Sequence, residues 1–261
     1  MSKEAVENTE RYIIQSVDKA LDLIELLAEH GSLNLIELTS MLEQPKSSTY
    51  RIVLTLENRG YISRSDEDGK YCLGYKQLML TRNLLERNTL RTAAIYEMKK
   101  LSERYGDTVN LGVLVDGKIL YVEIIESTHA LRMMDSIGSR SPFHATAMGK
   151  AIAAYMDSKE VEGLVQVYGL PPLTPNTIQS VPQLKAALKK IQTDGYALDD
   201  EEIVEGARCV AATIFDMYGK PAGAISLSGA MHRFKPELLA DISANVQEAA
   251  AAISRKLGFQ A

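Results

Sequence analysis

The chain has few cysteines. Only Cys72 and Cys209 occur among its 261 residues, which is too few for a disulfide framework or for a zinc site made of cysteine pairs. Scarce cysteines of this kind are typical of proteins from reducing compartments. We therefore expect a cytoplasmic protein.

Long apolar runs are also missing. No run approaches the ~18 residues that a membrane-spanning helix needs, and the first twelve residues, MSKEAVENTERY, lack the apolar segment of a signal peptide. Hydrophobic residues make up 46% of the chain and charged residues 24%, which is typical of a globular protein. We expect no membrane partner, and either one large domain or two of ordinary size.

An excess of positive charge is absent as well, since the net charge is −5. That value argues against a protein that coats nucleic acid by bulk charge, but it leaves room for a local basic patch. Residues 1–43 carry three basic and nine acidic side chains, whereas residues 44–82 carry seven basic and four acidic ones. A nucleic-acid surface is therefore expected between about residues 44 and 82.

Three helices are predicted in the first 60 residues. The first ends at Gly31 as a C-cap, and the second starts at Asn34, with Glu37 three residues later as in a capping box. Pro45 is expected in the first turn of the third helix, PKSSTYRIVLTLENRG, which ends at Gly60. The apolar stripe of the first helix consists of Val17, Ala20, Leu21, Ile24, Leu27 and Ala28.

The third helix has one face for packing and one polar face. Its inner positions are Thr49, Ile52, Val53 and Leu56, and its outward positions are Lys46, Ser47, Ser48, Tyr50, Arg51 and Thr55. Residues 61–64 and 70–73 then form a β-hairpin. Three helices followed by a hairpin predict a winged helix-turn-helix, although three helices with a solvated basic surface would give a similar pattern. The hairpin and the local basic charge favour DNA binding.

The polar half of the third helix offers hydroxyls and a guanidinium to the major groove. We expect Ser47, Ser48, Tyr50 and Arg51 to read bases. We expect Lys46, Arg64 and Lys70 to hold backbone phosphates.

Two further hairpins are predicted after residue 105. The apolar runs of VNLGVLVDGKILYVEII surround Asp116-Gly117, and RCVAATIFD and PAGAISLSG surround residues 218–220. Another strand is expected near 131–135, and helices at 91–104, 147–156, 158–167, 181–194 and after Pro236. An antiparallel sheet covered by helices is an α+β architecture. The Pro-rich segment 169–177 is expected as a surface loop and as a poor site.

Three blocks of this chain resemble the IclR family of bacterial regulators. LEQPKSSTYRIVLTLENRGYISRSDEDGKYCLG resembles that family's recognition helix and wing, GYALDDEEIVEGARCVAATIFD its C-terminal signature, and PFHATAMGKAIAA a third block. The resemblance covers the chain from about residue 14 to its end. It implies a winged helix at 10–74, a linker helix at 75–89 and a GAF-like effector-binding domain at 90–261, in a homodimer or homotetramer. From its sequence pattern alone, the segment 75–88 could equally be a simple packing helix.

Together with the residues, the resemblance implies an effector site. Ser226 and Ser228 alternate with Leu227, so that both hydroxyls lie on one face of a strand. With the backbone of Ala147 and Met148 they are expected to bind the acid end of a small carboxylate such as a keto acid or sugar acid. Asp199, Cys209 and His144 would line the rest, and Leu111, Met133 and Met134 would supply an apolar wall.

Enzymatic alternatives have weak support. Cys209 with His144 could suggest a thiol nucleophile, but an apolar strand raises rather than lowers a thiol pKa. MGKA at 148–151 lacks the glycine spacing of a phosphate loop, and His129, Asp199, Glu202 and Cys209 have no metal-binding spacing. We expect no catalytic residue, no metal and no cofactor.

The expected function is a transcription regulator that binds operator DNA and a small carboxylate. The resemblance implies a repressor, which is the more common type in this family. An activator of the same design and an interaction module without DNA binding are the alternatives. The module would be favoured if changes at Lys46 and Arg51 left every partner interaction intact.

Overall fold

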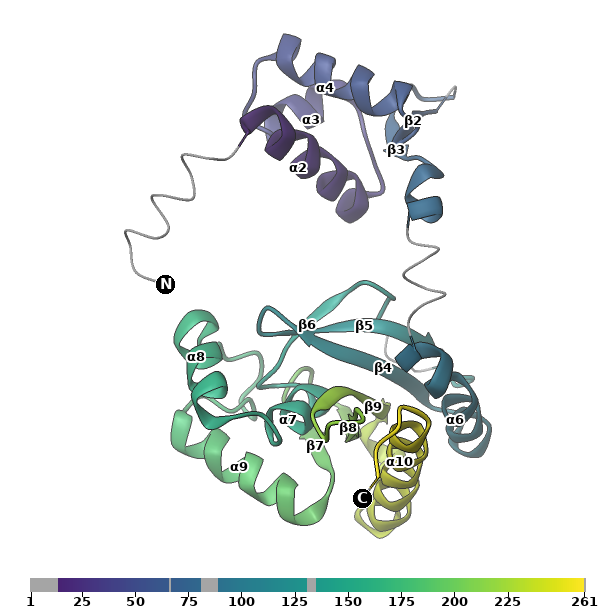
Figure 1. Ribbon diagram of the computed structural model, residues 1–261, viewed down its shortest axis with the longest axis vertical. Helices are drawn as coiled ribbons and strands as arrows, with labels where there is room; N and C mark the ends of the chain where they lie inside the picture. Colours follow the sequence, from purple (N-terminus) through teal and green to yellow (C-terminus); the bar gives the residue numbers. More distant parts are fainter. Residues whose placement is uncertain (1–13, 66, 81–88, 131–134, 261) are drawn as a thin grey trace. The chain divides into compact units, whose positions relative to one another are not determined.

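The computed structural model describes residues 14–65, 67–80, 89–130 and 135–260 (Figure 1). The chain divides into two compact units, residues 1–87 and 88–261. Among the described residues, no helix is long and apolar enough to cross a membrane.

The first unit contains three helices and a small sheet. The helices are α2 (Gln15–His30), α3 (Leu35–Met41) and α4 (Lys46–Asn58). The antiparallel sheet has the order β1-β3-β2, and its strands are β1 (Ser32–Leu33), β2 (Ile62–Arg64) and β3 (Tyr71–Leu73). The β2–β3 hairpin confirms the predicted wing, whereas the short strand β1 was not predicted.

Local sequence signals explain where these helices begin and end. Asn34 accepts hydrogen bonds from the N–H groups of Ile36 and Glu37, and the Glu37 side chain accepts one from the N–H of Asn34, which confirms the capping box. Gly31 ends α2 with φ +75°, as predicted. Pro45 is the N-cap of α4 and therefore precedes its first turn, one position earlier than predicted.

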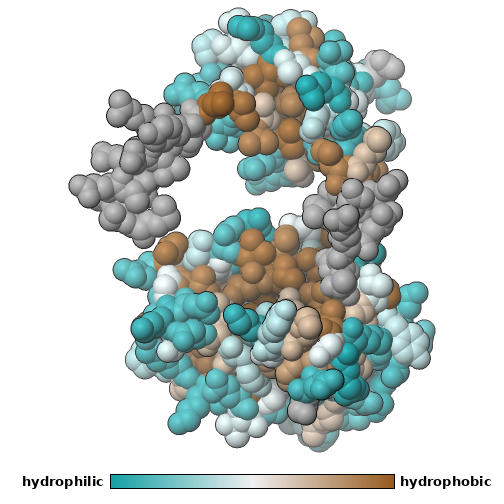
Figure 2. Space-filling view, viewed as in Figure 1, coloured by the Kyte–Doolittle hydropathy of each residue, from teal (hydrophilic) through white to brown (hydrophobic). Residues whose placement is uncertain are grey.

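The core of the first unit corrects the predicted stripe of α2. Leu23 and Leu27 are buried, and Ala20 and Ile24 pack beside them. Val17 and Leu21, which the predicted stripe included, are more than half exposed, and Ala28 is exposed as well. Figure 2 shows apolar patches on the surface of this unit. The prediction of the buried face was wrong at these positions because a helix with apolar residues around much of its circumference does not define a single inner face.

The second unit is built on a six-stranded antiparallel sheet with the order β6-β5-β4-β9-β8-β7. Its strands are β4 (Thr108–Val115), β5 (Lys118–Ile125), β6 (Arg140–Pro142), β7 (Ala197–Asp200), β8 (Ala207–Phe215) and β9 (Pro221–Ala230). Its helices are α6 (Thr89–Tyr105), α7 (Ala147–Ala153), α8 (Ser158–Tyr168), α9 (Val181–Asp194) and α10 (Pro236–Lys256). Both predicted hairpins are confirmed, and β4 turns into β5 at Asp116-Gly117.

Helices cover both faces of this sheet (Figure 1). On one face, α6 and α10 pack on a core that includes Val109, Leu111 and Leu227. On the other face, α7 and α9 pack on a core that includes Cys209 and Ala211. Because side chains alternate along a strand, each central strand contributes to both cores.

Some predicted elements lie partly outside the described residues. Residues 76–80 are helical, as the predicted helix at 75–88 requires, but its remaining residues 81–88 are not described. The strand expected near 131–135 also lies outside, apart from Asp135, which belongs to no strand. Strands β6 and β7 were not predicted.

Candidate DNA interface and candidate effector site

Helix α4 presents a polar surface. Thr49, Val53 and Leu56 are buried against the rest of the unit, which leaves the opposite side of the helix free. The positions expected to read bases and phosphates lie on that side. Lys46, Ser47, Tyr50 and Arg51 are exposed and Ser48 is partly buried.

The tip of the β2–β3 hairpin brings Arg64 and Lys70 close together. The N–H of Ser65 donates to the carbonyl of Lys70 at 2.8 Å, which closes the hairpin. Arg64 Nε donates to the carbonyl of Gly69 at 3.1 Å, and its guanidinium lies 5.7 Å from the centre of the Tyr71 ring. The guanidinium is thus oriented within the wing while the side chain stays exposed.

In the second unit, a row of polar residues crosses four strands on the face covered by α7. Thr108 lies opposite Ser228, Ser228 opposite Cys209, and Cys209 opposite Asp199. Directly opposite residues in antiparallel strands point to the same face. One register step away, Asn110 lies opposite Ser226. These six residues, Thr108, Asn110, Asp199, Cys209, Ser226 and Ser228, are called the polar row below.

The polar row brings together four of the predicted effector residues and adds two that were missed. Asp199, Cys209, Ser226 and Ser228 were expected, and each is buried. Asn110 and Thr108 were not expected, although both are only 1% exposed. The available signal for Asn110 was its position as the one polar side chain in the run VNLGVLV.

Helix α7 begins above this face of the sheet. Thr146 is its N-cap and accepts a hydrogen bond from the N–H of Gly149 at 3.0 Å. A side chain at Gly149 would place its Cβ 2.2 Å from the carbonyl oxygen of Phe143, so only glycine allows this close approach. Ala147 and Met148 are both buried in the first turn, and the N–H groups of a first turn have no partner within their helix.

A charged cluster joins α7 to the loop after β7. Lys150 Nζ forms a buried ion pair with Glu202 Oε1, and the N–H of Glu202 donates to Asp199 Oδ1 at 2.8 Å. Burial raises the pKa of Asp199 to about 6, although the nearby Lys150 cation opposes this shift. Burial raises the pKa of Glu202 in the same way.

Cys209 is a buried thiol rather than a nucleophile. Burial raises the pKa of its thiol well above the usual value, and the neighbouring Asp199 carboxylate adds to this effect. A raised pKa keeps the sulfur protonated near neutral pH. Cys209 therefore offers a polarizable wall to a ligand rather than a thiolate.

The segment 169–177 is mostly exposed, as predicted, but hydrogen bonds connect it to the residues of the site. His144 Nε2 lies 3.1 Å from the carbonyl oxygen of Pro171, and burial lowers the pKa of this imidazole. Thr174 Oγ1 donates to the carbonyl of Glu201 and Thr177 Oγ1 to that of Glu202, both at 2.6 Å. The segment thus holds the loop that carries Glu202 in place.

The predicted apolar wall needs one correction. Leu111 lies on the opposite face of the sheet from the polar row, in the core with α6 and α10. Alternation along β4 separates it from Asn110, so it cannot line a site on the α7 face. Met133 and Met134 lie outside the described residues.

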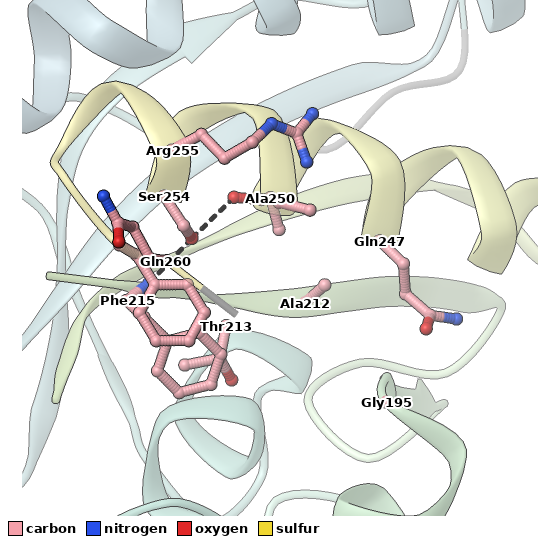
Figure 3. A pocket seen from close by; sticks show the side chains of 11 residues that line it. Gly195, Ala212, Thr213, Phe215, Gln247, Ala250, Ser254, Arg255 and Gln260 are labelled. Carbon is pink, nitrogen blue, oxygen red and sulfur yellow. Dashed lines mark hydrogen bonds between the residues drawn. The ribbon is translucent and has the colours of Figure 1, made fainter. Parts of the chain in front are cut away.

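A separate hollow of about 510 Å³ lies between β8 and α10 (Figure 3). Its inner hydroxyls are already used, since Thr213 Oγ1 donates to Ala151 O at 2.7 Å and Ser254 Oγ to Ala250 O at 2.8 Å. The polar row is therefore the better candidate for a ligand. Within the described part of the chain, no group of three or more His, Cys, Asp or Glu residues could hold a metal ion.

Three helices and a β-hairpin, with an exposed polar face on α4, have the architecture of a winged helix-turn-helix DNA-binding domain. Comparison with known proteins gives the family. The model of the IclR helix-turn-helix domain matches residues 16–66, and that of the bacterial transcriptional regulator IclR C-terminal domain matches residues 82–255. The chain belongs to the IclR family of transcriptional regulators.

Similar proteins agree with this family. The HTH-type transcriptional regulator XynR of Escherichia coli (strain K12) is 35% identical over 95% of this chain and 99% of its own length. The transcriptional repressor IclR of the same strain is 33% identical over 94% of this chain and 90% of its own length. The crystal structure of Thermotoga maritima IclR matches with a TM-score of 0.79 and 31% identity, covering 95% of this chain and all of that one.

Proposed function

We propose that this regulator is a repressor of a catabolic operon, and that a small carboxylate bound in the second unit controls its affinity for operator DNA. The carboxylate belongs to the keto acids or sugar acids. Such a regulator works in the bacterial cytoplasm, where its operator lies. The similarity to a repressor of the same family supports the sign of regulation.

The observation that carries this proposal is the buried row of hydroxyl, thiol, amide and carboxyl groups beneath the start of α7. Buried polar groups in such number cost free energy unless they are paired, and a ligand pocket typically combines a few of them with apolar walls. In the proposal, Ser226 and Ser228 with the backbone of Ala147 and Met148 bind the acid group. Asp199, Cys209 and His144 line the remainder.

On the DNA side, two copies of α4 enter successive major grooves of a pseudo-palindromic operator, since the active species is a homodimer or a homotetramer. Ser47, Ser48, Tyr50 and Arg51 reach base edges. Lys46, Arg64 and Lys70 contact phosphates. The exposure of α4 and of the hairpin tip supports this arrangement.

Effector binding alters operator affinity only if the effector prefers one arrangement of the two DNA-binding units. Coupling free energies of this kind are typically about 1–3 kcal/mol, or roughly 5- to 150-fold in affinity. The loop that carries Glu202 and the start of α7 both contact the site, so they are the elements that would change on binding.

The test is a mobility shift of the DNA upstream of the neighbouring operon, with and without glyoxylate, pyruvate and 2-keto-3-deoxygluconate. Salt-sensitive, sequence-selective binding that one acid releases would support the whole proposal. Selective binding that an acid strengthens would point to an activator. The absence of selective binding at moderate salt would contradict the DNA-binding assignment of α4.

A further inference from the structure

Asn110 occupies a special place in the polar row. It lies on β4, one strand away from the two serines of β9. Its Nδ2 donates to Ser228 Oγ at 3.1 Å and to Ser226 Oγ at 3.3 Å. A serine oxygen that accepts from this amide keeps its own hydroxyl hydrogen for another acceptor. The two serine oxygens also lie 3.5 Å apart, so one hydroxyl can donate to the other. Asn110 therefore leaves at least one of the two hydroxyl hydrogens for a ligand.

The other end of the same amide has no hydrogen-bond partner among the residues that the structure describes. Asn110 Oδ1 and Thr108 Oγ1 are buried and accept or donate no hydrogen bond to any residue that the structure describes. Both residues are 1% exposed, and their positions i and i+2 on β4 place them on the same face of the sheet. Unpaired buried polar atoms are rare in native proteins, and each calls for a specific explanation.

The two unpaired groups have complementary chemistry. The amide oxygen of Asn110 can only accept a hydrogen bond, so its partner must donate one. The Thr108 hydroxyl can accept as well as donate, and its buried hydrogen needs an acceptor. A single hydroxyl group that donates to Asn110 Oδ1 and accepts from Thr108 satisfies both residues. A keto oxygen leaves Asn110 Oδ1 unpaired, and an ammonium group leaves the Thr108 hydrogen unpaired.

We propose that the effector is a hydroxylated carboxylic acid, and that Asn110 and Thr108 form the subsite for its hydroxyl group. This inference rests on the proposed function, because the serines of the same row bind the acid group. The effector hydroxyl donates to Asn110 Oδ1 and accepts from Thr108 Oγ1. The subsite selects hydroxy acids over keto acids and over unsubstituted acids of the same length.

The experiment measures dissociation constants by calorimetry on the full-length protein with matched acids. The series are lactate, pyruvate and propionate; gluconate and hexanoate; and 4-hydroxybenzoate and benzoate. We expect the hydroxy acid to bind at least about tenfold more tightly than its counterparts in the series that binds best, which corresponds to about 1.4 kcal/mol. Leaving a buried acceptor unpaired has a cost of this size.

Two variants assign the preference to the subsite. Valine has nearly the same shape as threonine, and Thr108→Val leaves the amide–serine hydrogen bonds in place. The variant should therefore bind the hydroxy acid about tenfold more weakly and bind the unsubstituted acid within about twofold of wild type. Asn110→Leu should remove the preference altogether. Thr213→Val is the matched control, because Thr213 is a buried threonine whose hydroxyl bonds to Ala151; it should leave the ratio of the two acids unchanged.

The outcomes separate this inference from the proposed function. If a keto or unsubstituted acid binds as tightly as the hydroxy acid, or if both variants retain the preference, the hydroxyl subsite is wrong while carboxylate sensing stands. If no acid in any series binds, the proposed carboxylate sensor and its subsite are both wrong.

Discussion

Lys150 on α7 and Glu202 after β7, separated by 52 residues in sequence, form an ion pair in which both residues are at least nine-tenths buried. The pair ties the helix above the polar row to the loop beside it. Its position beside Asp199, whose side chain accepts from the N–H of Glu202, makes it part of the frame of the proposed effector site.

The first prediction concerns this ion pair. Removing one partner leaves an uncompensated buried charge, so Lys150→Met or Glu202→Gln should each lower the free energy of unfolding by about 3–5 kcal/mol. The free energy of unfolding of the double variant should fall by much less than the sum of the decreases in the two single variants. Urea unfolding of the four proteins measures this coupling, and strictly additive losses would show that the pair has no mutual stabilisation.

The second prediction concerns the carboxyl of Asp199. Its pKa is raised from 3.8 to about 6 in the folded protein, so its protonated form is favoured by folding. This contribution to stability is fully present below pH 3.8 and is lost as the pH rises through about 6. Asp199→Asn, which imitates the protonated form, should therefore raise the free energy of unfolding at pH 7.5 by up to about 3 kcal/mol.

The free energy of unfolding of Asp199→Asn should also depend less on pH than that of wild type. Urea unfolding of wild type and Asp199→Asn at pH 4.5, 6.0 and 7.5 gives the comparison, and the advantage of the variant should shrink towards low pH. An advantage that stays constant across this range would mean that Asp199 does not titrate there.

The third prediction concerns the segment 169–177. Thr177 is buried, donates to the carbonyl of Glu202 and accepts from the N–H groups of Leu173 and Thr174. Thr177→Val removes these three hydrogen bonds, so it should lower the free energy of unfolding by about 1–3 kcal/mol. Hydrogen exchange should become faster in residues 171–177 and 200–206.

A matched control is Thr193→Val. Thr193 is exposed on α9, and its hydroxyl donates to the carbonyl of Lys189 on the same helix, so its replacement should change stability by less than about 0.5 kcal/mol. Equal effects of the two valine variants would argue against the proposal that the hydrogen bonds of Thr177 stabilise the loop that carries Glu202.

The fourth prediction concerns Arg51 on α4. Arg51→Ala should weaken operator binding by about 1–3 kcal/mol and reduce the preference for matched over mismatched sites, because a base-reading guanidinium is lost. Fluorescence anisotropy with both DNAs measures the two effects. Arg255→Ala removes the same charge from the exposed surface of the second unit and should leave the preference unchanged. Equal selectivity of Arg51→Ala and wild type would remove Arg51 from the base-reading set.

The sequence predicted the elements that local signals define. The capping box at Asn34, the turn at Asp116-Gly117 and the bounds of α9 depend on neighbouring residues, and each was found. Strands β1, β6 and β7 were missed because they are two to four residues long and are held by distant partners. Their pairing cannot be read from a short segment alone.

The site was predicted only in part, because it also depends on the pairing of strands that are distant in sequence. Ser226 and Ser228 could be placed on one face from their spacing, and the family resemblance implied Asp199 and Cys209. Asn110 was missed and Leu111 was assigned to the wrong face, although alternation places these neighbours on opposite sides of β4. Deciding which of the two shares a face with the serines requires the register between β4 and β9, which only the structure supplies.

The fifth and most direct test of the central claim is an operator titration with the Ser226→Ala/Ser228→Ala variant. The hydroxyls lie in the second unit, so the variant should bind operator DNA with wild-type affinity in the absence of effector. With the most effective acid from the mobility shifts, wild type should change its DNA affinity by about 5- to 150-fold, and the variant should not respond at the same concentration. A variant that responds like wild type would contradict the account that the polar row senses the effector.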